Sequence, residues 1–197
     1  MTFAPLGVDL TRFRPLPQSE AASRRVVNVG SLTAVKDQAL LLRAFRRVAA
    51  AQPAAELVIA GEGALRGELE ALAAGLPVRF AGLVPQDQLP AWYAGASLCV
   101  QTSRHEAQGL AVLEAAACGL GVVGTPVGVL PELGQVAATE AELAEAMLAV
   151  MGAGARRQAL AAAGQAVVRE RYGLEGAVAR FAALYAGASS SGPAPAD

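Results

Sequence analysis

The sequence has few of the residues that build metal centres or disulfide frameworks. Its 197 residues include one histidine, His105, and two cysteines, Cys99 and Cys118. A single histidine excludes a histidine cluster, and the two cysteines lie in apolar runs without metal-ligand spacing. We therefore expect buried free thiols, a cytoplasmic location and no metal or other cofactor.

Long apolar runs and a strong net charge are also lacking. No window approaches the roughly 18 uninterrupted apolar residues of a membrane helix. The start has no basic stretch followed by an apolar stretch, so we expect no signal peptide. The formal net charge of -1 gives no electrostatic reason to expect a nucleic acid or an anionic membrane as partner. The length fits one domain with a sizeable core.

The chain instead alternates short apolar runs with longer helical patterns. Five apolar runs predict buried strands, at residues 24–30, 55–61, 77–82, 97–102 and 121–126. Helical patterns separate them, and after Thr125 the chain turns mostly helical. This alternation predicts an α/β fold: one Rossmann-like lobe with a parallel sheet flanked by helices, and a helical C-terminal section. In such sheets, ligands bind at the carboxyl ends of the strands.

The chain divides into three parts. A leading segment of residues 1–23 precedes one domain of residues 24–187, and residues 188–197 form a tail. The tail, ASSSGPAPAD, is small, polar and proline-bearing, so we expect it to be disordered.

Two loops near predicted strand ends carry possible phosphate-binding residues. In GEGALRG, after the second strand, the third glycine, Gly67, comes one residue too late for a dinucleotide-binding motif, and a tight turn explains the loop better. In GSLTAVKDQ, after the first strand, Lys36 precedes a predicted helix that Asp37 can cap. A lysine there could meet a phosphate, although most lysines in proteins are simply solvated.

The segment from Ser103 to Pro126 is more informative because it contains two glutamates among small apolar residues. Gly109 and Leu110 should begin a helix and leave backbone N–H groups open to an anion. Glu114 lies inside this apolar helix and must find partners, either ligand hydroxyls or an arginine, such as Arg104 or one on the C-terminal helices. Glu106 lies at the mouth of the site, or else is a solvated loop residue.

These residues carry a resemblance to a known family. The segment HEAQGLAVLEAAACGLGVVGT resembles the E-x7-E segment of retaining glycosyltransferases of the two-lobed GT-B fold (glycosyl transferases group 1). Further segments match in the expected order, at residues 7–15, 29–45, 57–70, 78–103, 127–133 and 169–187. The ordered set covers nearly all of residues 6–187 and corresponds to the donor-binding, C-terminal lobe of that fold.

The resemblance implies a role for each site residue. Glu114 would hydrogen-bond the ribose of a nucleotide sugar, and Glu106 would lie against the donor sugar. Gly109 and Leu110 would hold the diphosphate with their N–H groups, and Lys36 would neutralise it as it leaves. The backbone around Leu83 and Val84 would meet the base. The expected activity is retaining glycosyl transfer, with Glu106 and Lys36 as the catalytic residues and no metal.

The sequence also departs from the family pattern. Ser31 stands where the family usually has a phosphate-binding arginine, and Ala107 and Gln108 replace a glycine and an aromatic residue. The acceptor lobe is absent, so the resemblance implies an excised or truncated donor lobe, a partner carrying the acceptor lobe, or weak self-association through the last helix. Two alternatives stay open: a non-catalytic nucleotide-sugar binding or scaffolding lobe, which these departures suggest, and a hydrolase-like or epimerase relative acting on a nucleotide sugar.

Overall fold

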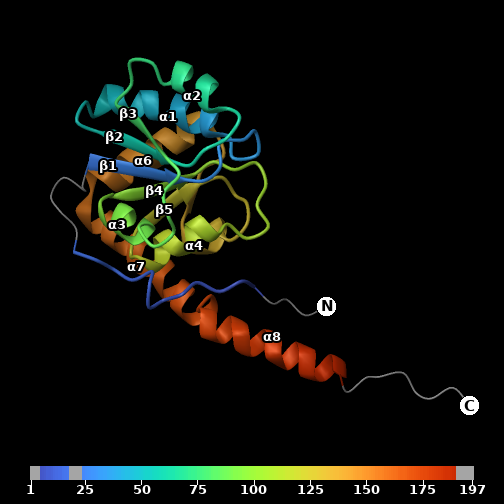
Figure 1. Ribbon diagram of the computed structural model, residues 1–197. Coiled ribbons are helices and arrows are strands. Elements are labelled where there is room, and N and C mark those ends of the chain that lie inside the picture. Colours follow the sequence, from blue (N-terminus) through green and yellow to red (C-terminus); the bar gives the residue numbers. More distant parts are fainter. Residues whose placement is uncertain (1–4, 18–23, 190–197) are drawn as a thin grey trace, which may run out of the picture.

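The computed structural model describes residues 5–17 and 24–189, with the side chains of residues 187–189 left aside. Within these residues one six-stranded sheet has the strand order β3-β2-β1-β4-β5-β6 (Figure 1). All neighbouring strands are parallel, which confirms the α/β prediction. The strands are β1 (Arg25–Val29), β2 (Glu56–Ala60), β3 (Val78–Gly82), β4 (Leu98–Gln101), β5 (Gly121–Gly124) and β6 (Gln135–Val136).

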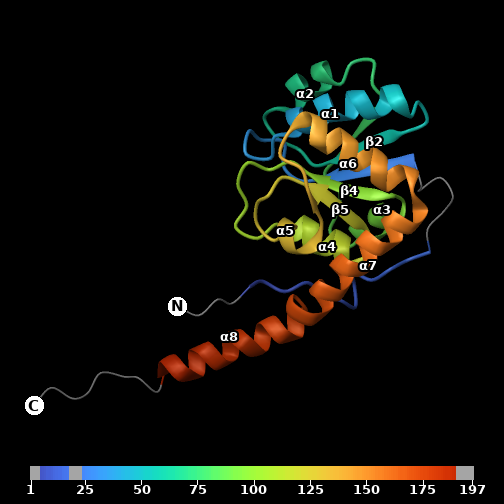
Figure 2. The ribbon, with the colours of Figure 1, turned by 180° about the vertical axis from the view of Figure 1, so that it is seen from behind.

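Helices cover both faces of the sheet, as Figures 1 and 2 show from opposite sides. One core contains side chains of α1 (Gln38–Ala51), α2 (Arg66–Leu72) and α6 (Glu140–Gly152). The second core contains side chains of α3 (Leu89–Ala94), α4 (Leu110–Ala117), α5 (Leu130–Leu133) and α7 (Gly154–Arg171). The central strands are buried from both sides, which explains why their sequences are continuously apolar rather than alternating.

Asp37 caps the start of α1, as its position in the sequence predicted. Asp37 is the N-cap, and its side chain accepts a hydrogen bond of 3.2 Å from the backbone N–H of Leu40. Its φ of 43° places this aspartate in the left-handed region, where a short polar side chain is tolerated better than most.

The segment after β5 departs from the expected helical pattern. It forms the short helix α5 and then β6, which extends the sheet by two residues next to β5. A strand of this length has no periodicity to recognise. Gly134 permits the chain just before β6 to approach β5 closely, because a Cβ at this position would lie 2.3 Å from the carbonyl oxygen of Val122.

The last helix, α8 (Leu174–Ser189), projects away from the body of the domain (Figures 1 and 2). Its base is joined to the leading segment, since the N–H of Val8 donates to Tyr172 and the N–H of Leu174 donates to Val8. The helix includes the first two residues of the predicted tail, and residues 190–197 lie outside the described residues. No helix in the described part of the chain is long and apolar enough to span a membrane.

Several large apolar side chains are exposed along α8. Val178 is 59% exposed and Phe181 is 37% exposed, whereas nearer the base of the helix Gly7 packs closely against Leu174 and Ala177. We call this set the α8 stripe; it consists of Leu174, Val178, Phe181, Leu184 and Tyr185.

Candidate functional site

The loops at the carboxyl edge of the sheet gather the residues predicted from sequence. Lys36 lies on the loop after β1, and Leu83 and Val84 follow β3. Glu106 lies on the loop between β4 and α4, and Glu114 lies on α4 itself. Parallel topology brings these loops to one edge although they are far apart in the sequence.

Lys36 and Glu106 form an ion pair between the loops after β1 and β4. The Lys36 Nζ donates to Glu106 Oε1, and both side chains are largely shielded, with 24% and 13% exposed. The same Oε1 accepts hydrogen bonds from Ser103 Oγ at 2.8 Å and Gln101 Nε2 at 3.1 Å. The carboxylate of Glu106 is therefore fixed by hydrogen bonds from three side chains, and Glu106 is not a solvated loop residue.

These donors determine the protonation state of Glu106. Burial alone would raise the pKa of the carboxyl, but the hydrogen bonds from Lys36, Ser103 and Gln101 outweigh it and leave the pKa below its usual value. Glu106 is thus ionised at neutral pH. No donor among the described residues reaches its Oε2, so this oxygen can accept a hydrogen bond from a ligand.

Glu114 is buried on α4, with 6% of the residue exposed. Its oxygens accept hydrogen bonds from Gln86 Nε2 at 3.0 Å and from the Tyr93 hydroxyl at 3.4 Å. Burial raises the pKa of Glu114, and these two donors together with the charge of Arg12 offset only part of the rise. The predicted alternative, an ion pair with Arg104, is wrong, because Arg104 Nε contacts Asp37 Oδ2 at 2.8 Å instead.

The start of α4 is open. Gly109 is the N-cap with φ of 91°, a conformation that favours glycine, and no side chain caps the helix. In the described part of the chain, the N–H groups of Gly109 and Leu110 donate to no acceptor. Unpaired N–H groups and the partial positive charge of the helix end together favour an anion at this position.

Two cavities flank these groups. One, of about 320 Å³, is lined by Glu114, Leu110, Gln86 and Arg12, among others. The other, of about 220 Å³, lies between the ends of β1, β2 and β3 and is lined by Ser31, Leu83 and Val84, among others. These two cavities are lined by five of the donor-binding residues predicted from sequence: Ser31, Leu83, Val84, Leu110 and Glu114. Of the other three, Lys36 and Glu106 form the ion pair, and Gly109 is the N-cap of α4.

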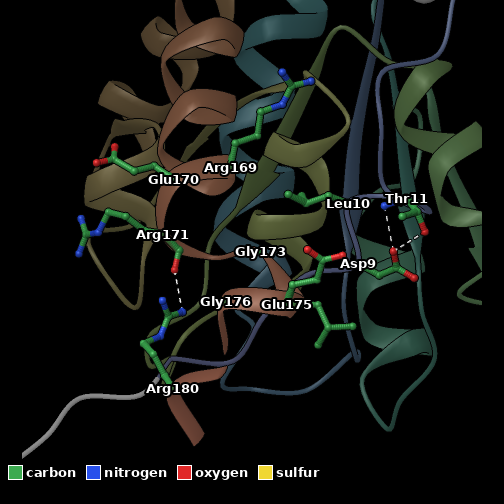
Figure 3. A pocket seen from close by; sticks show the side chains of 11 residues that line it. Asp9, Leu10, Thr11, Arg169, Glu170, Arg171, Gly173, Glu175, Gly176 and Arg180 are labelled. Atoms are coloured by element: carbon green, nitrogen blue, oxygen red, sulfur yellow. Dashed lines mark hydrogen bonds between the residues drawn. The ribbon is translucent and has the colours of Figure 1, made fainter. Parts of the chain in front are cut away.

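A larger cavity of about 350 Å³ lies at the junction of α7 and α8 (Figure 3). Three arginines line it, but they do not converge: Arg180 donates to the carbonyl oxygen of Arg171, and Arg171 pairs with Glu132 outside the cavity. In Figure 3 the side chains of Arg169 and Arg171 point in different directions. This cavity contains none of the predicted site residues.

The two unusual residues of the turn before α4 have structural explanations. Ala107 does not have a positive φ, so the expected need for a glycine does not arise there. Gln108 holds the leading segment with two hydrogen bonds of 2.8 Å, one to the N–H and one to the carbonyl of Leu6. Gly128 supports the same turn, since a Cβ there would lie 2.5 Å from the Gln108 carbonyl oxygen.

Sequence reasoning missed several residues that hold the two glutamates. They are Arg12, Gln86, Tyr93, Gln101 and Ser103. The one available signal was a polar residue next to an apolar run. Gln101 directly follows the apolar residues Leu98, Cys99 and Val100, and its side chain is buried. Gln86 and Tyr93 reach Glu114 through tertiary packing. Ser103 reaches Glu106 from three residues away on the same loop. Arg12 donates to Gln86 and acts on Glu114 through its charge.

The two cysteines agree with the expectation of free, buried thiols. Burial raises the pKa of both Cys99 and Cys118 to about 12, so both are protonated at neutral pH and serve packing. The absence of a metal requirement stays a prediction.

Known structures share this fold. Sucrose-phosphate synthase from Thermosynechococcus elongatus superimposes with a TM-score of 0.82 at 24% identity, covering 96% of this chain and 53% of that one. Anabaena Alr3699/HepE, solved with UDP and glucose, gives 0.76 at 20% identity, with coverage of 91% and 55%. The C-terminal domain of a glycosyl transferase group 1 family protein (LpcC) from Francisella tularensis gives 0.73 at 19% identity, and the match covers 85% of this chain and 100% of that domain.

Curated relatives are similar in sequence. A GDP-mannose-dependent alpha-(1-6)-phosphatidylinositol dimannoside mannosyltransferase of Mycobacterium tuberculosis is 36% identical over 138 residues, covering 66% of this chain and 36% of that protein. A GDP-mannose-dependent monoacylated alpha-(1-6)-phosphatidylinositol monomannoside mannosyltransferase of Corynebacterium glutamicum is 31% identical over 198 residues, covering 87% and 52%. The chain thus spans about a third to a half of each. Residues 23–153 match the sequence profile of Glycosyl transferases group 1, and the chain belongs to this family.

Proposed function

We propose that this chain is the donor-binding lobe of a retaining glycosyltransferase that uses a nucleoside diphosphate sugar. The observation that carries the proposal is the grouping at one sheet edge of an open helix start, Lys36 and two glutamates with opposite pKa shifts. An anion site beside carboxylates that can accept hydrogen bonds from hydroxyl groups suits a nucleoside diphosphate sugar, which has phosphates at its centre and hydroxyl groups on the ribose and on the sugar.

The donor would lie along the carboxyl edge. Its base would contact the backbone near Leu83 and Val84, and its ribose hydroxyls would donate to Glu114 in place of Gln86. The diphosphate would accept hydrogen bonds from the N–H groups of Gly109 and Leu110. The sugar would then reach Glu106, whose Oε2 is open.

Each group has a chemical task in transfer. The bond between the anomeric carbon and the diphosphate oxygen breaks, and the nucleoside diphosphate leaves with the bonding electrons. Lys36 and the positive end of α4 stabilise the charge that develops on the departing oxygen. Ionised Glu106 orients the sugar and, being deprotonated, acts as an acceptor rather than an acid. The acceptor hydroxyl attacks the same face of the sugar and passes its proton to the departing diphosphate oxygen, and no metal is needed.

Transfer needs a second lobe to hold the acceptor. Catalysis depends on keeping both reactants in a near-attack geometry, and this chain holds only the donor. The α8 stripe offers an apolar surface for such a lobe, whether it belongs to the same protein or to a partner. Weak association between copies of this chain is the other use of that surface.

The names of the relatives indicate which donor to test first. Two of them are GDP-mannose-dependent, and the Anabaena structure contains UDP and glucose. The experiment is a calorimetric screen of the chain with GDP, UDP and ADP and their sugars. Saturable binding to one series supports the proposal, and no heat from any at millimolar concentration contradicts it.

A second candidate function is a donor lobe that binds without catalysing. Ser31 favours it, because a serine cannot provide the charge or the two-pronged hydrogen bonds of an arginine at a phosphate. Sugar transfer in the presence of the cognate acceptor lobe would decide between the two. Sugar release without an acceptor would instead favour a hydrolase.

A further inference from the structure

A buried polar network leads from the middle of the sheet to Glu106. Asn28 on β1 and Gln101 on β4 are 1% and 3% exposed, and each directly follows a buried apolar residue of its strand, Val27 and Val100. Asn28 Nδ2 donates to Gln101 Oε1 at 3.2 Å and to the Val100 carbonyl at 2.8 Å. Gln101 Nε2 then donates to Ser103 Oγ at 2.9 Å and to Glu106 Oε1 at 3.1 Å.

This network is a poor solution for stability alone. Asn28 Oδ1 is buried without a hydrogen-bond partner among the described residues, and an unsatisfied buried acceptor costs free energy. Two apolar side chains of similar size would fill the same space without that cost. The network therefore needs an explanation other than packing.

The geometry at Glu106 supplies one. Three donors, from Lys36, Gln101 and Ser103, converge on Oε1, and Oε2 receives none from the described residues. Lys36 is a flexible side chain on a loop, and a phosphate would compete for its charge. Gln101 is different, because it is buried in a central strand and its amide orientation is fixed by Asn28.

We propose that Gln101, oriented by Asn28, is a positioning residue that holds Oε1 of Glu106 on the protein and leaves Oε2 for a hydroxyl of the donor sugar. The part concerning the sugar rests on the proposed function; the part concerning Glu106 does not. When a diphosphate draws Lys36 away, Gln101 and Ser103 keep the carboxylate in place and ionised.

The test is a titration of the Glu106 side-chain carboxyl by NMR, with its signal assigned through Glu106→Gln. Gln101→Met keeps the volume but cannot donate, so the pKa of Glu106 should shift upward. The variant should also be less stable, because Asn28 loses an acceptor. The double variant Asn28→Leu/Gln101→Leu removes both polar side chains. Its stability should be higher than that of Gln101→Met, while the pKa of Glu106 should still be shifted upward.

Ser97→Ala is the matched control. Its hydroxyl is also buried and donates to the Arg25 carbonyl at 2.9 Å, but it lies before β4, at the opposite end from Glu106. This control should lose stability without moving the pKa of Glu106. An unchanged Glu106 pKa in both Gln101 variants would overturn the proposal, and if the methionine variant does not fold, the double variant decides.

A second measurement tests whether Oε2 of Glu106 binds the donor sugar. In the wild-type chain GDP-mannose should bind more tightly than GDP, and Gln101→Met should bring this affinity ratio toward one. A shifted pKa with an unchanged ratio would overturn the assignment of Oε2 to the sugar. If the wild-type chain binds no nucleotide, the proposed function fails, and the pKa measurement still decides whether Gln101 positions Glu106.

Discussion

Lys36 and Glu106 are 70 positions apart in sequence and form an ion pair across the carboxyl edge of the sheet. The cation best placed for a phosphate is thus already paired with a carboxylate. A diphosphate would have to compete with Glu106 for this lysine, so we expect Glu106 and Glu114 to affect diphosphate binding unequally.

Changing the two members of this pair should have opposite effects on GDP. Lys36→Met should weaken GDP binding by roughly 1.5–3 kcal/mol, the range for a hydrogen bond to a charged group. Glu106→Gln should tighten it, because Lys36 is released and a negative charge near the phosphates is removed. Calorimetry measures both, and Arg47→Gln, which removes a cation paired with Glu140 on another face, is the control. Weaker GDP binding in Glu106→Gln would contradict this account.

Glu114 should affect nucleotide affinity more than folding. Glu114→Gln and Glu114→Leu should each weaken binding, with a loss on the order of 1.5–3 kcal/mol for a charge-assisted hydrogen bond. The melting temperature should change little in the glutamine variant, because Gln86 and Tyr93 keep a partner. A large fall in melting temperature with unchanged affinity would instead make Glu114 a structural residue.

The raised pKa of Glu114 predicts opposite pH trends for folding and binding. The folded chain holds this proton more tightly than the unfolded chain does, so the contribution of Glu114 to stability falls as pH rises from the usual glutamate pKa through the raised one. Nucleotide affinity should rise over the same window, because the ionised carboxylate is the better acceptor. Both trends are measured as the difference between the wild type and Glu114→Gln, and parallel trends would count against the ribose role.

Much of the fold could be predicted because its signals are local. Continuous apolar runs and helical spacing identify β1 to β5 and the long helices, and Asp37 marks the start of α1. The two-residue β6 could not be found, since its pairing with β5 depends on Gly134 and not on a pattern. At the site, Lys36, Glu106 and Glu114 were recognisable by motif, whereas Gln86 and Tyr93 reach Glu114 only through tertiary packing.

The α8 stripe should make the isolated chain self-associate weakly. Val178→Glu and Phe181→Glu place a charge in the stripe and should shift sedimentation toward monomer. Ala183→Glu adds the same charge to an exposed position on the opposite side of the helix and should not. The isolated chain should also transfer no sugar to any acceptor, so robust transfer by a monodisperse monomer would overturn the proposed need for a second lobe.

Titration of the wild-type chain and Lys36→Met with GDP, UDP and ADP by calorimetry tests the central claim most directly, namely that a nucleoside diphosphate binds between Lys36 and the start of α4. We predict saturable heat with at least one nucleotide and an affinity loss of about tenfold or more in the variant. No heat from any of the three at millimolar concentration, or equal affinity in the two proteins, would contradict the site.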